Sequence, residues 1–542
     1  MKRRTPRDKP RTHRPDLLWF LGLTALAWLH RLAFMLSNRD RAWPFTIFYE
    51  GDAETFYDHA RAILSGSLYD AGIPFHPPAF PHLLAFIHSI VGAGAPDSSV
   101  PYIAVKCIMA VFGSLPVGLI YLIVKPYLGR TVALVTAGLC LYNFGLYIIG
   151  ISAVSEAFYL TLMLASLLWW SRRFPHPLAA AYTIKNFKTD GRRRGLLVEG
   201  FFLGALLGLM TLTRAEGLLV ALILWGVGVA GAYGWKPDGK PRSLRPALLP
   251  WAMIALGFLL ALTPWTLRNR SNLENFNRRN SRVMAEPLPT FVPLTTYGPI
   301  NFALANNPKA DGGFSRAALP SNNNLTTLDL RDPEHLRFYR HGYSIGFEFM
   351  KDHPGDFLKL LLRKWGLYFE ALKLGWTQWD YPGGLTGLRR PVDLFVPHSY
   401  AAVWLQIPWA VLGLALMLKL GVPARRWAYC ILLLTLAGLV VTGAYFGYAR
   451  QGVLMLPLWF SCIALALVWL ISRIIAWRGA FHGIPDAPAP RLLRILGVVA
   501  LLLLLLEGWG ATTDRNYIAT GTTLPGQTLL NRDAVLYLTP EE

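Results

Sequence analysis

The sequence predicts an α-helical polytopic membrane protein with about eleven transmembrane helices, two interfacial helices in the first outer loop and a mixed outer domain. Of its 542 residues, 53% are hydrophobic and only 16% are charged. The apolar residues come in blocks of about twenty, the length needed to cross a bilayer core of about 30 Å. Basic residues gather in alternate connections between these blocks, as the positive-inside rule requires.

The predicted spans follow the apolar blocks, in chain order: 17–36, 102–124, 131–152, 155–171, 196–213, 216–234, 247–265, 400–419, 428–446, 453–472 and 492–508. The first block is too long for a signal-peptide core and lacks a small-residue cleavage pattern, so we expect it to be retained. The predicted division of the chain is an N-terminal transmembrane catalytic module (1–265), an outer domain (266–399), C-terminal transmembrane helices (400–508) and an outer tail (509–542).

The distribution of basic residues predicts the side of the membrane on which each connection lies. The strongly basic N-terminus is expected in the cytoplasm, together with the basic connections Lys125–Arg130, Arg172–Arg194, Lys236–Arg245, Lys419–Arg426 and Arg473–Arg494. The net charge of +21 is spread over these connections and does not form one basic face, so no nucleic-acid partner is expected. Membrane lipids are the expected surroundings.

The apolar stretch 81–91 is not counted as a span. It is only about twelve residues long, and counting it would invert every later loop. The segment 56–68 carries a helical stripe of Phe56, Ala60, Ile63 and Leu64, which suits a membrane surface. The first outer loop, about 38–100, is therefore expected to hold two surface-lying helices. All four cysteines fall inside apolar blocks without metal-ligand spacing, so packing roles are expected for them, with no disulfide framework.

Acidic residues at the outer surface are the first candidates for chemistry. Asp52, in Tyr-Glu-Gly-Asp-Ala, precedes the stripe of the first surface helix and suits either an N-cap or a general base held at the interface. The two roles are compatible, and Glu50 is a nearby alternative. Glu156 opens the fourth span, where it is either a favourable charge at a helix N-terminus or a functional carboxylate.

Basic residues on the outer side run against the positive-inside trend. Arg214, Arg268 (followed by Asn269) and Arg450 stand at the outer ends of different spans. Each could be a snorkelling interfacial residue, or the three guanidiniums could converge on the phosphate of a lipid. His76, before Pro77-Pro78, is a loop corner, a phosphate ligand or a metal ligand. Because no His-x-x-x-His or cysteine cluster lies nearby, no metal site is assigned, although a divalent metal stays open as a cofactor.

Several motifs together resemble the membrane-embedded glycosyltransferases of the GT-C superfamily, in particular the bacterial relatives of protein O-mannosyltransferases and lipid A aminoarabinose transferases. They are Gly-Asp-Ala-Glu-Thr-Phe-Tyr-Asp-His-Ala, His-Pro-Pro-Ala-Phe-Pro-His-Leu-Leu-Ala, Leu-Thr-Arg-Ala-Glu-Gly-Leu, Pro-Trp-Thr-Leu-Arg-Asn, Ala-Asn-Asn-Pro-Lys-Ala-Asp-Gly, Asp-His-Pro-Gly-Asp-Phe-Leu-Lys-Leu and Ala-Arg-Gln-Gly-Val-Leu-Met-Leu-Pro. Each is loose alone, and their order along the chain makes the resemblance more specific.

The resemblance implies a bacterial inner-membrane enzyme that moves a sugar from a polyprenyl-phosphate-linked donor to a lipid, glycan or protein acceptor at the periplasmic face, usually with inversion. Asp52 would be the general base on the acceptor hydroxyl. Arg268 and Arg450, with Arg214 and His76, would hold the departing lipid phosphate. Two departures leave the donor and the metal requirement open. Gly51 and Ala53 flank Asp52 where the family often has a paired Asp-Glu, and His76 stands where the aminoarabinose branch commonly has Lys.

Two other function classes remain at this point. A multi-pass lipid or solute transporter or flippase often shows inverted repeats and midplane charges, neither of which is clear in this sequence. A non-catalytic assembly factor would use the outer domain to bind a partner. One outer cavity joining Asp52 to Arg268 and Arg450 would favour the transferase, whereas a continuous central path would favour transport.

Overall fold

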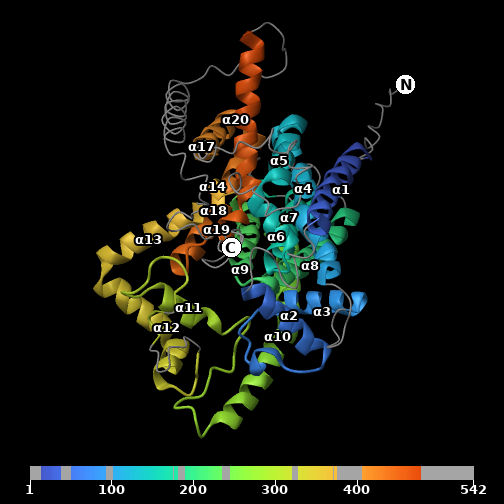
Figure 1. Ribbon diagram of the computed structural model, residues 1–542. Helices are drawn as coiled ribbons and strands as arrows, with labels where there is room; N and C mark the ends of the chain where they lie inside the picture. Colours follow the sequence, from blue (N-terminus) through green and yellow to red (C-terminus); the bar gives the residue numbers. More distant parts are fainter. Residues whose placement is uncertain are drawn as a thin grey trace.

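The computed structural model describes residues 14–37, 51–92, 102–174, 176–180, 190–234, 244–315, 317–319, 328–369, 371–374 and 406–477, and these ranges are almost entirely helical (Figure 1). The main bundle contains α1 (Arg14–Ser37), α4 (Tyr102–Leu128), α5 (Arg130–Tyr142), α6 (Phe144–Ile151), α7 (Ser155–Arg173), α8 (Asp190–Thr213), α9 (Gly217–Gly234), α10 (Leu244–Asn280), α17 (Gln406–Lys419), α18 (Val422–Ala444), α19 (Ala449–Val453) and α20 (Leu456–Trp477). Helix α4 packs against α1, α5 and α7 and forms the middle of this bundle.

Five helical segments in the described ranges are long and apolar enough to cross a membrane, namely Ala104–Leu128, Gly195–Thr213, Leu248–Asn280, Val422–Ala444 and Leu456–Arg473. Apolar side chains such as Leu256, Leu259 and Leu260 on α10 are exposed, as lipid-facing residues of a membrane helix are. These are the features of a polytopic membrane protein. The count of eleven spans stays a prediction, since block 492–508 and the start of block 400–419 lie outside the described residues.

The predicted span 131–152 is not one straight helix. The segments Arg130–Tyr142 and Gly145–Ile151 meet at 71°. Asn143 between them is extended (φ −73°, ψ 123°), and its Oδ1 accepts a hydrogen bond from the backbone N–H of Leu146 at 3.0 Å. The asparagine thus ends α5 and caps the start of α6, which the apolar run alone did not reveal. Taken together, the two helices would make a sixth span.

Helices α8 and α10 lie in close backbone contact because glycines face the interface. Gly200, Gly204 and Gly208 recur every four residues on α8. A Cβ added to Gly204 would lie 2.0 Å from the carbonyl oxygen of Ile254 on α10. From the other side, a Cβ on Gly257 would lie 2.0 Å from the carbonyl oxygen of Phe201. This spacing of small residues is typical of helix pairs that associate in membranes.

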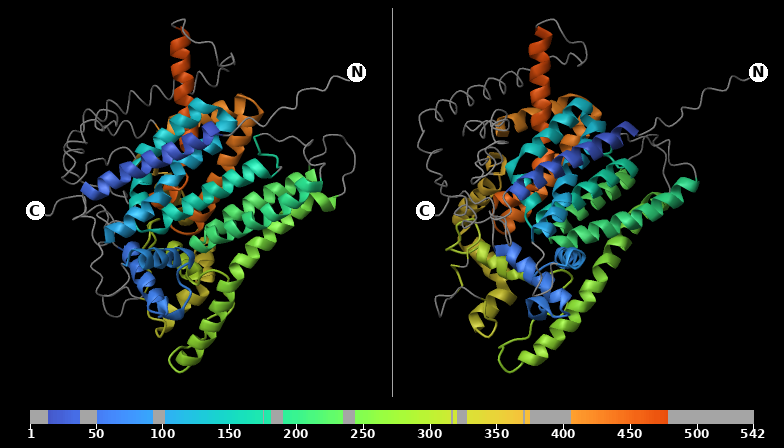
Figure 2. Two further views of the ribbon diagram at one scale, coloured as in Figure 1. Left: turned by 90° about the vertical axis from the view of Figure 1, so that its right-hand side faces the viewer. Right: turned by 45° about the vertical axis from the view of Figure 1, so that its right-hand side comes forward.

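The first outer loop forms two helices, α2 (Gly51–Leu64) and α3 (Ala79–Val91), joined through the short 3₁₀ turn η1 (Tyr69–Gly72). The helices predicted at 56–68 and 81–91 are therefore confirmed, with α2 beginning earlier than expected. They lie together at one end of the bundle, beside the middle of α10 (Figure 2). The rings of Phe56 on α2 and Phe80 on α3 meet edge to face with centroids 4.8 Å apart. Their position on a membrane surface stays a prediction.

Beyond the seventh predicted span, α10 continues to Asn280. The predicted outer segment then adds α11 (Tyr297–Ala305), α12 (Pro333–Asp352), α13 (Pro354–Phe369) and α14 (Ala371–Leu374). Asp332 caps α12, its Oδ1 accepting from the N–H of Glu334 at 2.8 Å. Leu273, Ile300, Leu336 and Tyr339 belong to a separate hydrophobic cluster that this segment builds with Phe446. Asn306 ties the segment to the bundle by donating to the carbonyl oxygen of Ala444 at 2.8 Å.

Segments predicted to share a side of the membrane contact one another at the ends of the bundle. At one end, Asp16 pairs with Lys125, and Arg426 donates to the carbonyl oxygen of Ala179 at 2.8 Å. All four come from connections predicted to be cytoplasmic. Predicted outer segments likewise meet one another, as where the N–H of Thr296 donates to the carbonyl oxygen of Pro74 at 2.8 Å. All four cysteines are free thiols, and three of them are buried, as packing roles require.

Candidate functional site

Four charged side chains from three separate parts of the chain meet in a buried network, which we call the ion network: Glu156, Arg214, Glu216 and Arg450. Glu156 begins α7, Arg214 and Glu216 lie in the turn between α8 and α9, and Arg450 lies on α19. One carboxylate oxygen of Glu156, Oε1, accepts from both Arg214 and Arg450. Arg214 also donates from Nε to Glu216 at 2.7 Å. The helix ends predicted to share the outer side thus deliver their charges to one point.

The network is shielded from water, because the side chain of Glu156 is 0% exposed, that of Arg450 10% and that of Arg214 17%. Burial alone would lower the pKa of Arg214, but the carboxylates of Glu156 and Glu216 outweigh it and raise that pKa. Two guanidiniums and two carboxylates balance in charge, as buried charges must to be tolerated. Arg214 also donates to the hydroxyl of Ser155 at 3.1 Å, which fixes its orientation.

A cavity of about 50 Å³ lies directly against the ion network. Glu216 and Gln451 line it together with apolar residues of α7, α9 and α18 such as Met163, Val220 and Leu434. It is roughly three to five times the smallest volume that holds one water molecule. A polar end made by the network and an apolar body between helices is the arrangement expected for part of an amphiphile.

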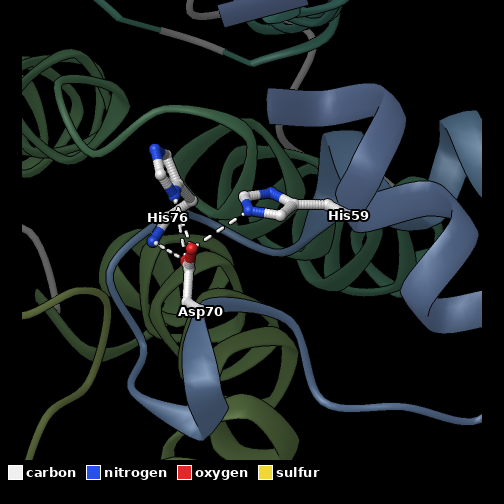
Figure 3. Close-up of side chains that lie close together, drawn as sticks. All are labelled: His59, Asp70 and His76. Carbon is white, nitrogen blue, oxygen red and sulfur yellow. Dashed lines mark hydrogen bonds and ion pairs between the residues drawn. The ribbon is translucent and has the colours of Figure 1, made fainter. Parts of the chain in front are cut away.

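A second cluster lies in the first outer loop, where His59 and His76 both point at the carboxylate of Asp70 from different directions (Figure 3). The distance from His59 Nε2 to Asp70 Oδ1 is 3.0 Å, and that from His76 Nδ1 to Asp70 Oδ2 is 2.9 Å. Burial alone would raise the pKa of Asp70, but the hydrogen bonds from His59 and His76 hold that pKa well below its usual range. We call these three residues the histidine–aspartate cluster.

Tyr297 of α11 lies between the two clusters. Its ring is 5.8 Å from that of Phe75, the residue before His76. Burial raises the pKa of Tyr297 to about 12, and the charges of Glu216 and Arg214 act on the same hydroxyl. The ion network and the histidine–aspartate cluster are therefore neighbouring parts of one end of the molecule.

The structure brings together only some of the predicted site residues. Arg214, Arg450 and Glu156 meet, whereas the guanidinium of Arg268 lies over the ring of Trp265, 4.4 Å from its centroid. Asn269 is buried and donates to the carbonyl oxygen of Val292 at 2.9 Å, which points to a structural role in holding that loop. The backbone of Asp52 lies in the first turn of α2. Its side chain, and all of Glu50, lie outside the described residues, so their roles stay predictions.

Sequence reasoning missed Glu216, Ser155, His59 and Asp70. Glu216 follows Arg214 by two positions, and its charge next to a suspected phosphate ligand could have prompted its inclusion. His59, Asp70 and His76 fall within one short stretch of sequence, but their uneven spacing matches no metal-ligand motif. The residues meet because the backbone of Asp70, with a φ of +52°, turns the carboxylate toward both histidines.

Comparisons with known proteins give only distant likenesses. No protein-family model matches the chain, and no curated protein matches it significantly. The crystal structure of the Archaeoglobus fulgidus oligosaccharyltransferase in the apo form is similar, with a TM-score of 0.45 and 13% identity over 94% of this chain and 56% of that chain. The same archaeal enzyme, AglB, in complex with an inhibitory peptide and a dolichol-phosphate gives a TM-score of 0.45 and 12% identity over 97% and 60%.

A third structure of that archaeal enzyme, in complex with Zn and sulfate, gives a TM-score of 0.46 and 13% identity over 97% of this chain and 57% of that chain. This chain thus spans less than two thirds of the length of the three archaeal chains. With TM-scores below 0.5, the likeness assigns neither a family nor an activity.

Proposed function

We propose that this protein is a glycosyltransferase that moves a sugar from a polyprenyl-phosphate-linked donor to an acceptor at the outer face of the membrane. The observation that carries the proposal is the ion network over an apolar cavity, with Arg214 and Arg450 converging from different helices. An anionic headgroup on an apolar chain is the ligand that such a site matches. Two of the motifs that resemble GT-C glycosyltransferases contain residues of the network, namely Leu-Thr-Arg-Ala-Glu-Gly-Leu and Ala-Arg-Gln-Gly-Val-Leu-Met-Leu-Pro.

In the proposed reaction, the bond between the anomeric carbon and the phosphate oxygen breaks, and a bond from that carbon to the acceptor oxygen forms with inversion. The proton of the acceptor hydroxyl passes to the carboxylate of Asp52, and the lipid phosphate leaves with the bonding electrons. Since phosphate is a good leaving group, stabilising its charge matters more than protonating it. A guanidinium has five N–H donors, so Arg214 and Arg450 can hold Glu156 and a phosphate together.

Binding of a lipid phosphate can be tested with farnesyl phosphate as the probe on the purified full-length protein. We expect it to raise the unfolding temperature, whereas farnesol and inorganic phosphate, which each lack one half of the ligand, raise it much less. Arg450→Gln should remove most of the shift. Arg173→Gln is the matched control, because Arg173 pairs with Glu199 at the other end of the bundle. Equal shifts from farnesol and farnesyl phosphate would refute a phosphate site.

The catalytic assignment is tested separately with Asp52→Asn. We expect this variant to lose sugar transfer in membranes while keeping the farnesyl phosphate shift, because a general base acts on the acceptor and not on the donor. Asp58→Asn is the matched control, since Asp58 is an exposed carboxylate on the same helix. Full transfer by Asp52→Asn would remove Asp52 from the mechanism. Mass spectrometry of cell-envelope glycans and glycoproteins with and without the protein would then identify the sugar and the acceptor.

A further inference from the structure

We propose that His59, Asp70 and His76 form a binding site for one divalent transition-metal ion, with zinc the ion that suits it best. The site does not depend on the proposed sugar transfer. Nε2 of His59, a carboxylate oxygen of Asp70 and Nδ1 of His76 all lie within 4.8 Å of one another.

The spacings from each histidine to Asp70 are already close to those of a metal site. Zinc binds nitrogen and carboxylate oxygen at about 2.0–2.2 Å in tetrahedral geometry, which places neighbouring ligand atoms roughly 3.3–3.5 Å apart. The present contacts to Asp70 are 3.0 Å from His59 and 2.9 Å from His76. Each therefore needs to open by only a few tenths of an ångström when an ion replaces the bridging protons.

The carboxylate of Asp70 is held in place by backbone as well as by the histidines. Among the described residues other than glycine, Asp70 alone has a positive φ, +52°. Left-handed backbone at a non-glycine residue costs about 1–2 kcal/mol, and such residues gather at functional sites. The N–H of His76 donates to Asp70 Oδ2 at 3.0 Å, so the loop from Asp70 to His76 closes on its own carboxylate.

The surroundings hold both imidazoles in place and leave one side of the cluster accessible. The ring of Phe56 packs edge to face on His59 and on His76, at centroid distances of 6.2 and 6.1 Å. The side chains of His59 and Asp70 are 7% and 12% exposed, whereas that of His76 is 27% exposed. An ion can therefore enter from the side of His76 and keep a position for water.

The ligand set selects the class of metal. Two imidazoles and one carboxylate suit zinc and similar transition metals, whereas magnesium and calcium prefer oxygen ligands. Three protein ligands with a fourth position for water are typical of zinc sites that are not purely structural.

Contacts of the loop before His76 show where a bound ion would lie. Pro74 and Phe75 of this loop contact Thr296 and Tyr297. A bound ion would thus fix the first outer loop beside α11 and next to the ion network.

Metal content of the purified full-length protein, with any affinity tag removed, tests the proposal. After chelation, the protein would be titrated with zinc, cobalt and magnesium chlorides. We expect about one zinc per chain, a cobalt absorption spectrum of four-coordinate type, and no competition from magnesium. His59→Asn, Asp70→Asn and His76→Asn should each weaken zinc binding by at least about tenfold. His82→Asn is the matched control, a histidine of the same loop region whose Nδ1 contacts the carbonyl oxygen of Pro78.

A second measurement uses only the wild-type chain, in case a variant fails to fold. Zinc should protect His76, the most exposed of the three cluster side chains, from diethyl pyrocarbonate and leave His82 as reactive as before, as mapped by mass spectrometry. Equal modification of His76 with and without zinc would overturn the proposal. So would zinc stoichiometry that is the same in the three cluster variants as in the wild type, since binding would then be adventitious.

Discussion

The two polar clusters at this end of the molecule are built in opposite ways. The ion network joins residues about three hundred positions apart, it is buried, and it pairs two guanidiniums with two carboxylates. The histidine–aspartate cluster comes from one short stretch of the chain, from α2 to the residues before α3. It is partly exposed at His76, and it contains two imidazoles whose protons can be exchanged for a metal ion. A balanced network between helix ends can hold the helices together and orient guanidiniums. The histidine–aspartate cluster can instead gain positive charge by binding a metal ion.

The difference bears on how an anion could bind here. Arg214 and Arg450 are already neutralised by Glu156 and Glu216, so a bound phosphate adds negative charge to a neutral site. In a medium of low polarity, that charge is costly unless a further positive group lies near. A divalent ion in the neighbouring loop would supply one. The ion network would then give hydrogen-bond donors to the phosphate, and the proposed metal site would give positive charge beside it.

The largest expected effect comes from removing the carboxylate of Glu156, which accepts from both Arg214 and Arg450. Glu156→Gln leaves Arg214 and Arg450 buried without the carboxylate between them, which should cost about 3–5 kcal/mol of unfolding free energy. Chemical unfolding in detergent measures this. Glu199→Gln, which breaks the exposed pair with Arg173, should cost no more than about 1 kcal/mol. If both variants lose the same stability, the network does not act as a buried unit.

The next largest effect concerns the histidine–aspartate cluster. Asp70→Asn removes charged hydrogen bonds and should cost about 1.5–3 kcal/mol of unfolding free energy. Asp70→Ala should cost roughly 1 kcal/mol more, because alanine tolerates the φ of +52° less well than asparagine does.

The pH dependence of the stability that Asp70 contributes follows from its lowered pKa. A carboxyl group whose pKa is lowered on folding stabilises the fold at every pH above the pKa it has in the unfolded chain, about 3.9. This contribution is lost as the pH falls below that value. The wild type should therefore keep its advantage over Asp70→Asn down to about pH 4. Asp58→Asn, on the exposed side of α2, should change stability by less than about 0.5 kcal/mol. An equal loss from Asp58→Asn and Asp70→Asn would mean that the cluster adds no stability.

Sequence reasoning succeeded where the physical signal is local or periodic. Apolar blocks and basic connections predicted α4, α8, α10, α18 and α20, and short amphipathic runs predicted α2 and α3. The same sidedness placed Glu156, Arg214 and Arg450 at one end. It could not place Asp70, because a left-handed backbone at a non-glycine residue leaves no pattern in the sequence. Nor could it show that Arg268 would turn to Trp265, since that depends on which face of α10 meets the first outer loop.

A smaller effect is expected at Lys364, a buried amine whose hydrogen-bond acceptors are neutral. Lys364 of α13 is fully buried and donates to Asn306 Oδ1 at 2.8 Å and to the carbonyl oxygen of Gly443 at 3.1 Å. Burial lowers the pKa of Lys364 to about 7, opposite to the shift of Arg214 beside its carboxylates.

Between pH 7 and about 10 the unfolded chain therefore holds a proton at Lys364 that the folded chain has lost. Stability from this group rises with pH in that window, by up to about 1.4 kcal/mol per pH unit. We expect Lys364→Met to lose this rise when unfolding free energies are compared from pH 7.5 to 9.5. Lys359→Met is the matched control, because Lys359 is 82% exposed on the same helix. Parallel curves for the wild type and Lys364→Met would show that Lys364 stays charged when buried.

The smallest effect concerns Arg268, the guanidinium that the structure places over Trp265 and not on Glu156. A cation–π contact at a partly exposed site is worth about 0.5–1 kcal/mol, so Arg268→Gln should lower unfolding free energy by that amount. Its effect on the farnesyl phosphate shift should be clearly smaller than that of Arg450→Gln. Arg270→Gln controls for the loss of charge alone, because Arg270 is exposed and pairs with Glu274. If Arg268→Gln abolishes the shift as Arg450→Gln does, Arg268 reaches the phosphate when the lipid binds, and the anion site is wider than the ion network.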